Sequence, residues 1–359
     1  MPNKFAQKIM KKITIQLSTI AMMMSIAFTF TACKKDEEKD KVKTSGVYVA
    51  GAERNENDIW IATLWKNGVP QKLSTDATKN SFANSVFVSN TDVYVIVSDN
   101  SDYVSNGRLW KNGQEQNLAG LHGGNASANA VFVSGKDMYV AGRNSEGQAT
   151  LWKNGVAKIL DTEQNTSAQS VFVLGNDVYV VQGRFLWKND TKSERLSVCN
   201  YGDFFGHSIF VSGNDVYVLG TGWSCYGGTW PNNNVVGKLW KNGVVQEFDV
   251  NITEGFSHSS IRGLSLFISG NDAYIAGHQF RDGKTYATLW KNMVVQDLTD
   301  GTNIAYAWSV FVFGNDVYVA GFERNRNGGP NVAKLWKNGV AQNLTDETNN
   351  AAALSVFVK

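Results

Sequence analysis

A five-letter word recurs along the whole chain and constrains its fold more than any other feature. "LWKNG" or a near copy is present seven times, and its successive tryptophans are 45, 42, 35, 53, 50 and 46 residues apart. The copies lie at residues 64–68, 109–113, 151–155, 186–190, 239–243, 289–293 and 335–339. Repeats with periods of this size indicate a solenoid or a β-propeller.

Each repeat contains the material for four short strands. "SVFV" or a variant is followed by words similar to "DVYVAG", "ATLWKNG" and "VAQNL". β-Branched and aromatic residues favour strands, and Asn-Gly favours a tight hairpin turn. The first two words are apolar at consecutive positions, which is typical of strands that are buried on both faces. Four-stranded sheets that stack on one another in a ring are the blades of a β-propeller.

The two ends of the repeated region complement each other. The pattern begins with a second strand at residues 47–51 and stops with a first strand at 355–358. An open array would need polar capping units, and the sequence contains none. We therefore predict an all-β, seven-bladed β-propeller over residues 46–359, with four antiparallel strands in each blade. The C-terminal strand should complete the blade that contains Trp65.

The first 32 residues have the pattern of an export signal. Lysines at positions 4, 8, 11 and 12 precede an uncharged, largely apolar run over residues 13–32, and translation could begin at Met1 or at Met10. "FTAC" at 30–33 resembles the lipobox of bacterial lipoproteins, although Phe30 replaces the usual leucine. The resemblance implies that residues 1–32 are a lipoprotein signal peptide and that Cys33 is lipidated, which would anchor the protein in a membrane. An ordinary cleaved signal and a single transmembrane helix are the alternatives.

A charged segment at residues 33–45 separates this signal from the propeller. It is typical of a solvated tether, and it is similar to the Lys- and acid-rich signals that send some Gram-negative lipoproteins to the cell surface. We therefore expect an outer-membrane lipoprotein of the cell envelope that could be exposed at the surface. Without residues 1–32 the chain has 30 basic and 32 acidic side chains, a formal charge of −2. This balance gives no indication of a nucleic-acid partner.

The fifth repeat has the longest loops, at residues 199–207 and 221–234. Cys199 and Cys225 should lie on the same face of this blade, and an exported protein can form a disulfide there. Two free buried thiols are the alternative. The same loops contain aromatic residues on which a sugar or a protein could stack, or which could form a small core of their own. The aromatic residues of this cluster are Tyr201, Phe204, Phe205, Trp223, Tyr226 and Trp230, of which the tyrosines and tryptophans are considered for binding.

One position just before each first strand differs from repeat to repeat. It follows a small residue and precedes Ser or Ala, so it should lie near the axis of the ring. Its occupants are Asn84, Asn129, Gln169, His207, Leu264, Trp308 and Leu354. They form one polar arc and one apolar arc, which could orient an amphipathic ligand. Alternatively, these side chains only pack beneath the loops.

Other residues have structural interpretations. We interpret the seven repeated tryptophans as core between blades, and Asp76, Asp300 and Asp346 as caps of Asx turns. The four histidines do not have the spacing of metal ligands, and the motifs of common catalytic sites are absent from the sequence. We therefore expect no metal, no cofactor and no catalytic residue.

The chain resembles bacterial β-propeller lipoproteins, and its repeated words are specific to a fold and not to an activity. The first functional hypothesis is a membrane-anchored, non-catalytic binding protein for a glycan or protein ligand. The second is a glycan-active hydrolase or lyase, which would need two carboxylates about 5–9 Å apart. The third is a structural component of an envelope complex. The predicted ligand-binding residues are Trp223, Tyr226, Trp230, His207, Trp308, Tyr201, Asn84, Asn129 and Gln169.

Overall fold

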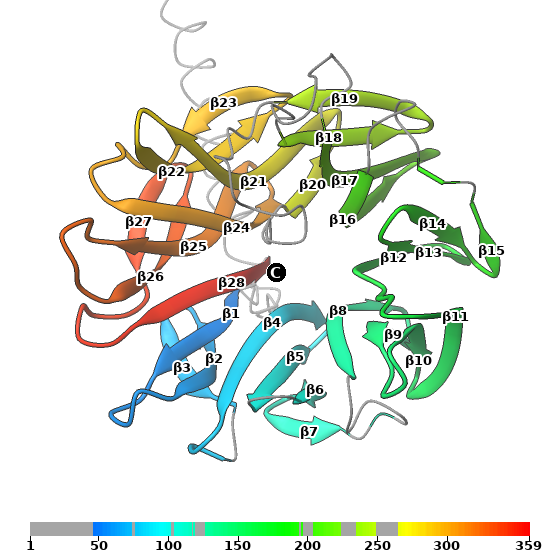
Figure 1. Cartoon of the computed structure of the whole chain (residues 1–359), viewed down its shortest axis with the longest axis horizontal. Coiled ribbons are helices and arrows are strands. Elements are labelled where there is room, and N and C mark those ends of the chain that lie inside the picture. The colour runs from blue at the N-terminus through cyan, green and yellow to red at the C-terminus, as the bar shows by residue number, and fades with distance from the viewer. Residues whose placement is uncertain are drawn as a thin grey trace, which may run out of the picture. The chain divides into compact units, whose positions relative to one another are not determined.

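The described part of the chain is a ring of β-sheets. The computed structural model describes residues 46–73, 76–101, 104–116, 118, 126–193, 195–196, 204–223, 235–248 and 265–359. Within these residues, 28 strands form seven antiparallel sheets of four strands each, arranged as blades around an axis (Figure 1). The predicted seven-bladed β-propeller is confirmed.

Each blade has one strand at each of four distances from the axis. The innermost strands are β28 (Ala351–Val358), β4 (Asn80–Ser89), β8 (Ser127–Ser134), β12 (Ser170–Leu174), β16 (Phe204–Ser212), β20 (Ser265–Ser269) and β24 (Ile304–Phe313). The second strands are β1 (Val47–Arg54), β5 (Asp92–Ser101), β9 (Asp137–Arg143), β13 (Asp177–Gln182), β17 (Asp215–Trp223), β21 (Asp272–Arg281) and β25 (Asp316–Arg324). The third strands are β2 (Trp60–Lys66), β6 (Val104–Lys111), β10 (Gln148–Lys153), β14 (Phe185–Lys188), β18 (Val235–Lys241), β22 (Lys284–Lys291) and β26 (Asn331–Lys337). The outermost strands are β3 (Val69–Lys72), β7 (Gln114–Gln116), β11 (Val156–Gln164), β15 (Thr191–Lys192), β19 (Val244–Phe248), β23 (Val294–Asp297) and β27 (Val340–Asn343).

The C-terminal strand closes the ring. β28 pairs with β1 in the order β28-β1-β2-β3, so blade 1 combines both ends of the described region (Figure 1). Val47 is opposite Val358, and Gly46 and Lys359 exchange two backbone hydrogen bonds of 2.8 and 3.0 Å. The predicted closure is therefore confirmed, and we number the blades from this one.

The structure explains the repeated word "LWKNG". In blade 7, Lys337 Nζ lies 2.7 Å from Asp316 Oδ2, and the side chain of Asn338 donates a hydrogen bond of 2.7 Å to Asp316 Oδ1. The side-chain oxygen of Asn338 accepts a bond of 2.8 Å from the backbone N–H of Val317, and Gly339 has a φ of 82°. The Lys337 ammonium, and then the Asn338 amide, lower the pKa of Asp316. Blades 2 to 6 contain the same clamp between their second and third strands.

The apolar cores lie between blades. Trp65 of blade 1, for example, is fully buried among Tyr318, Leu335 and Leu344 of blade 7. Each of the seven repeated tryptophans packs in this way against the preceding blade. Five of them are at most 5% exposed, whereas Trp187 and Trp240 are partly buried. The interpretation of these residues as core between blades is confirmed.

The word "SVFV" forms two sets of contacts around the axis. Its phenylalanines contact one another in a closed sequence, with adjacent ring centroids 4.6 to 5.0 Å apart. We call this set the phenylalanine collar: Phe87, Phe132, Phe172, Phe210, Phe267, Phe311 and Phe357. Its serines connect neighbouring blades, as when Ser309 Oγ accepts a bond of 3.1 Å from the backbone N–H of Val356. Sequence analysis did not predict either set of contacts.

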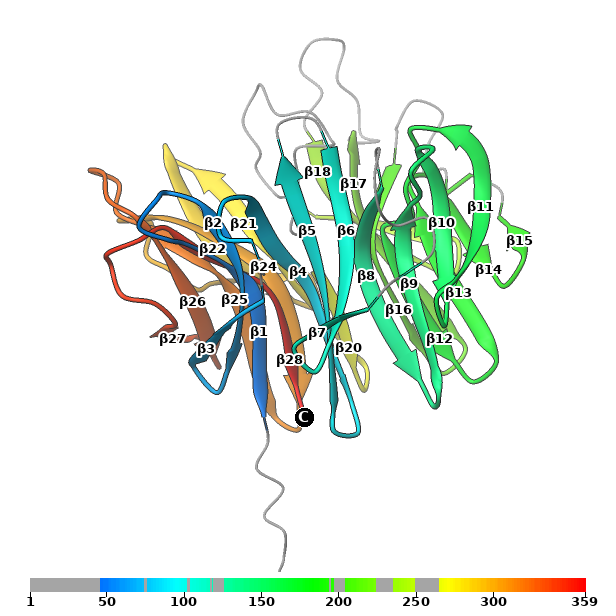
Figure 2. The same ribbon diagram turned by 90° about the horizontal axis from the view of Figure 1, so that it is seen from below.

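The two faces of the ring differ. The hairpin turns between innermost and second strands lie at the lower edge of Figure 2, together with the C-terminus. The connections between second and third strands, such as residues 55–59, lie at the opposite edge. We call these edges the bottom face and the top face. Because Gly46 pairs with Lys359, the chain enters the propeller on the bottom face.

Candidate functional site

A β-bulge recurs at the same height on the innermost strands. The pairing with the second strand skips Asn84, Asn129, His207, Trp308 and Leu354, one in each of five blades. A bulged residue is left out of the strand ladder, and bulges commonly re-aim a side chain next to a functional site. All five side chains are partly buried, as is that of Gln169 immediately before β12. We call these six residues the channel rim.

The backbone of the rim is tightly packed. The small residues that precede the bulges are buried, including Ala83 at 0% and Ala307 at 1% exposure. Opposite the bulge of blade 7, a Cβ atom on Gly321 would lie 2.0 Å from the carbonyl oxygen of Tyr306. Close backbone approach and buried alanines therefore hold the bulge in place, so its variable side chain projects from a rigid frame.

Two amide side chains of the rim are anchored through their nitrogen atoms. Asn84 Nδ2 donates to Ser98 Oγ at 2.7 Å. Asn129 Nδ2 donates to Ser167 Oγ and to the carbonyl oxygen of Ala168, both at 2.8 Å. Because a carbonyl oxygen can only accept, the second bond fixes the orientation of the Asn129 amide. Among the described residues neither side-chain oxygen accepts a hydrogen bond.

Gln169 and His207 continue this polar arc. A ring nitrogen of His207, Nε2, lies 2.9 Å from Thr221 Oγ1. Burial lowers the pKa of His207 to about 4, so its imidazole is neutral at physiological pH. The backbone N–H of Gln169 donates to the carbonyl of Val181 at 2.8 Å. The polar arc therefore presents hydrogen-bonding groups without a charge.

Aromatic side chains gather around Trp308 on blades 6 and 7. Trp308 and Tyr306 both lie nearly parallel to Phe322, with centroid distances of 6.4 and 5.1 Å. His278 of blade 6 packs edge-on against Tyr306 at 4.6 Å, and burial lowers the pKa of His278 to about 4. Sequence analysis missed Tyr306, Phe322 and His278. The alternation of alanine with aromatic residues in "IAYAW" was the signal that could have identified Tyr306.

Several predicted site residues lie outside the described part of the chain. Trp223 is the last residue of β17, and its side chain is not among those described. The proposed aromatic loop cluster and disulfide of blade 5, and the lipidation site, are predictions that no described contact tests. The residues concerned are Cys33, Cys199, Tyr201, Cys225, Tyr226 and Trp230. The structure therefore brings the rim residues together on one ring and leaves the blade 5 loops as a prediction.

Acidic residues near the top face have structural partners. Glu323 Oε2 lies 3.0 Å from Lys334 Nζ, and Glu53 and Asp99 are similarly paired with Lys72 and Arg108. Asp76, Asp300 and Asp346 each accept a bond from the backbone N–H two residues later, as an Asx turn requires. The hydroxyl of Thr78, followed by its backbone N–H, lowers the pKa of Asp76 to about 2. Among the described residues no three His, Cys, Asp or Glu side chains are grouped as metal ligands.

Comparison with known proteins finds solved structures of low similarity to the chain. No protein-family model matches the chain, and no curated protein matches its sequence. A solved protein from Lactobacillus plantarum has a TM-score of 0.46 at 11% identity, covering 88% of this chain and 99% of its own. The computationally designed Ika8 protein has a TM-score of 0.42 at 15% identity, with 87% and 96% covered. The β-propeller domain of the Trilobed protease from Pyrococcus furiosus has a TM-score of 0.35 at 10% identity, with 74% and 97% covered.

The fold and the rim together define a seven-bladed β-propeller in which six blades present variable, uncharged side chains around the axis, in the half of the innermost strands nearer the top face. In the part of the chain that the structure describes, no helix is both long enough and apolar enough to cross a membrane.

Proposed function

We propose that the protein is a non-catalytic binding protein, anchored to the outer membrane through lipidated Cys33, whose ligand docks on the channel rim. The ligand is a glycan or a protein segment. The supporting observation is the recurring bulge, which in five blades places one variable side chain on an otherwise repeated strand. Variable side chains on a rigid scaffold are where binding functions usually lie.

The point at which the chain enters the propeller agrees with this arrangement. Gly46 lies on the bottom face, so the tether of residues 33–45 would join the propeller on the side opposite the rim. We place the binding surface on the top face. The long loops of blade 5, with Trp223, Tyr226 and Trp230, would enlarge the binding surface on the same face.

The enzyme hypothesis has less support. Hydrolysis or elimination on a glycan needs carboxylates that can reach the substrate. Glu53, Asp99 and Glu323 are each held in an ion pair, and the rim residues themselves include no carboxylate. We therefore favour binding without catalysis.

The location of the site can be tested on arrays that display both glycans and peptides. We expect wild-type protein to bind at least one probe, and Trp308→Ala to lose that signal. Val340→Ser is the matched control, because Val340 is 72% exposed at the start of an outermost strand. Loss of signal in Val340→Ser with retention in Trp308→Ala would place the site on the outer wall and contradict the proposal.

The anchoring can be tested separately. Replacing Cys33 with Ser removes the thiol that lipidation requires, so Cys33→Ser should move the protein from the membrane fraction to the soluble fraction. The measurement is membrane fractionation followed by mass spectrometry of the N-terminus. A variant that still sediments with membranes and keeps its leader would indicate a transmembrane anchor instead.

A further inference from the structure

The innermost strands, as far as the structure describes them, carry no charged side chain. None of the seven innermost strands contains Asp, Glu, Lys or Arg, although 18% of the residues in the chain are charged. The titratable side chain on the rim, His207, is neutral at physiological pH because burial lowers its pKa to about 4. A ligand with a fixed charge would therefore meet no opposite charge on the described rim.

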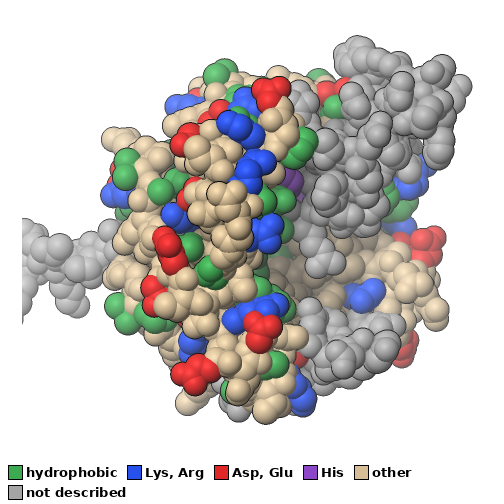
Figure 3. All heavy atoms as spheres, turned by 60° about the vertical axis from the view of Figure 1, so that its left-hand side comes forward, with side chains coloured by type: hydrophobic (Ala, Val, Ile, Leu, Met, Phe, Trp, Pro, Cys, Tyr) green, Lys and Arg blue, Asp and Glu red, His purple; other side chains and the backbone are tan. Residues whose placement is uncertain are grey.

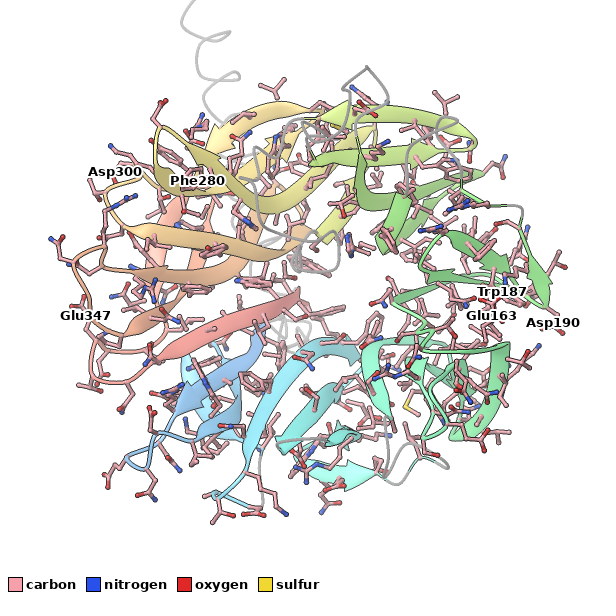
Figure 4. The ribbon with its side chains drawn as sticks, viewed as in Figure 1. Glu163, Trp187, Asp190, Phe280, Asp300 and Glu347 are labelled. Carbon is pink, nitrogen blue, oxygen red and sulfur yellow. The ribbon has the colours of Figure 1, made fainter. Side chains whose placement is uncertain are left out.

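Charged side chains begin on the second strands, where Glu53, Asp99 and Glu323 form ion pairs with Lys72, Arg108 and Lys334. Figure 4 shows Glu163, Asp190, Asp300 and Glu347 at the outer margin, away from the axis. On the outer wall of blades 6, 7 and 1, basic and acidic side chains are interspersed (Figure 3). The acidic side chains nearest the rim are thus neutralised by pairing, which argues against electrostatic recognition there.

The polar arc is suited to hydroxyl groups. Asn84 and Asn129 use their nitrogen atoms within the protein, and among the described residues their side-chain oxygens accept no hydrogen bond. An acceptor needs a donor, and the hydroxyl groups of a carbohydrate are uncharged donors. Because both amides are already anchored, little side-chain entropy is lost when the ligand binds.

The aromatic arc supplies the complementary surface. Trp308 is partly exposed and is supported by Phe322 and Tyr306, which limit its movement. A sugar ring has an apolar face of C–H groups, and an indole provides a wide, rigid surface on which that face can pack. The two arcs thus offer stacking on one side of the axis and hydrogen-bond acceptors on the other.

We infer that the ligand of the channel rim is an uncharged oligosaccharide. One sugar ring packs on Trp308, and hydroxyl groups of the same chain donate to Asn84 and Asn129 across the mouth. This inference rests on the proposed function and names its ligand class. Acidic polysaccharides and peptides are the competing occupants.

The test uses the full chain, extracted in a detergent without a sugar headgroup, and isothermal titration calorimetry. The uncharged probes are hexamers of glucose, xylose and mannose in their common linkages, and the charged probes are an oligogalacturonate and a cationic glucosamine oligomer. We expect at least one uncharged hexamer to bind and both charged oligomers to give no signal. The affinity for the uncharged hexamer should change less than about twofold between about 0.05 and 0.5 M NaCl, since no ion pair forms. It should also be constant from about pH 5.5 to 8, because His207 does not titrate in that range.

Three variants examine the contacts. Trp308→Ala should weaken binding about tenfold or more, while Trp308→Phe, which keeps an aromatic ring, should recover part of it. Asn84→Ala removes one acceptor and should weaken binding about fivefold. Val340→Ser on the outer strand should bind as the wild type does. Melting curves of all variants show whether a lost signal reflects unfolding.

The outcomes separate the inference from the proposed function. If a charged oligomer or an array peptide binds and Trp308→Ala weakens it, the rim is the site but the ligand class is wrong. If an uncharged hexamer binds and neither Trp308→Ala nor Asn84→Ala affects it, the inference and the proposed site both fail. If none of the uncharged hexamers binds at millimolar concentration, the inference is overturned.

Discussion

At the scale of single residues, the tryptophans divide into two structural classes. Trp152 is fully buried in an interface between blades, as are most tryptophans of the repeated word. Trp308 lies on a bulge outside that word and remains partly exposed. The first class should determine stability, and the second should determine binding.

Trp152→Ala tests this division. The substitution leaves a cavity between blades 2 and 3, and we expect it to reduce the free energy of unfolding by about 3–5 kcal/mol. The measurement is chemical denaturation followed by tryptophan fluorescence or circular dichroism. The matched variant Trp308→Ala should lose less than half as much stability, and an equal or larger loss would show that Trp308 belongs to the core.

The identity of the rim residues could be predicted from the sequence, but their contacts could not. The repeat alignment shows that residue 308 occupies a variable position, because the neighbouring Ala and Ser recur. The packing of His278 on Tyr306 brings together two blades and residues 28 positions apart, and no periodic pattern encodes it. The phenylalanine collar was missed for a different reason. "SVFV" was interpreted as uniformly buried, whereas the structure buries its valines and leaves its phenylalanines partly exposed to the axis.

At the scale of one element, the innermost strand combines a constant half with a variable half. The constant half carries a serine that accepts a hydrogen bond from the next blade. In blade 7 this is Ser309, which accepts a bond from the backbone N–H of Val356. The same bond is formed in six of the seven interfaces. Blade 3 has Ala130 at this position, so its interface with blade 4 lacks the bond.

This exception provides a paired prediction. Ser309→Ala should reduce the free energy of unfolding by about 1–2 kcal/mol, because it leaves the backbone N–H of Val356 without its partner. Ala130→Ser should create the missing bond to Val171 and add about 0.5–1 kcal/mol. Urea denaturation of both variants checks the pair. A stability loss in Ala130→Ser would mean that the blade 3 interface is packed differently from the other six.

At the scale of the whole molecule, the account depends on a ring closed by its own C-terminal strand. The sequence was sufficient to predict this closure, because the first and last words of the repeat complete one blade, and β28 pairs with β1 as expected. The ligand was not predictable in the same way. The repeat specifies the scaffold, whereas the proposed ligand contacts lie at the six rim positions and on loops that have no repeat.

Removing residues 354–359 tests the closure. The deletion exposes the edge of β1 and removes Phe357 from the collar, so the ring loses contacts in blade 1 and with both neighbouring blades. We expect the melting temperature to fall by about 10 °C or more. Calorimetry of the truncated and complete chains gives the comparison, and coincident melting curves would refute a structural role for this strand.

The most direct test of the central claim, that the channel rim binds the ligand, is an NMR titration of the tryptophan indole N–H signals. The chain has eleven tryptophans, and spectra of Trp308→Phe and Trp152→Phe identify two of the signals by their disappearance. On addition of the uncharged oligosaccharide that binds most tightly, the account predicts that the Trp308 signal moves and the buried Trp152 signal does not. A titration that shifts other indole signals and leaves Trp308 unchanged at saturation would contradict it.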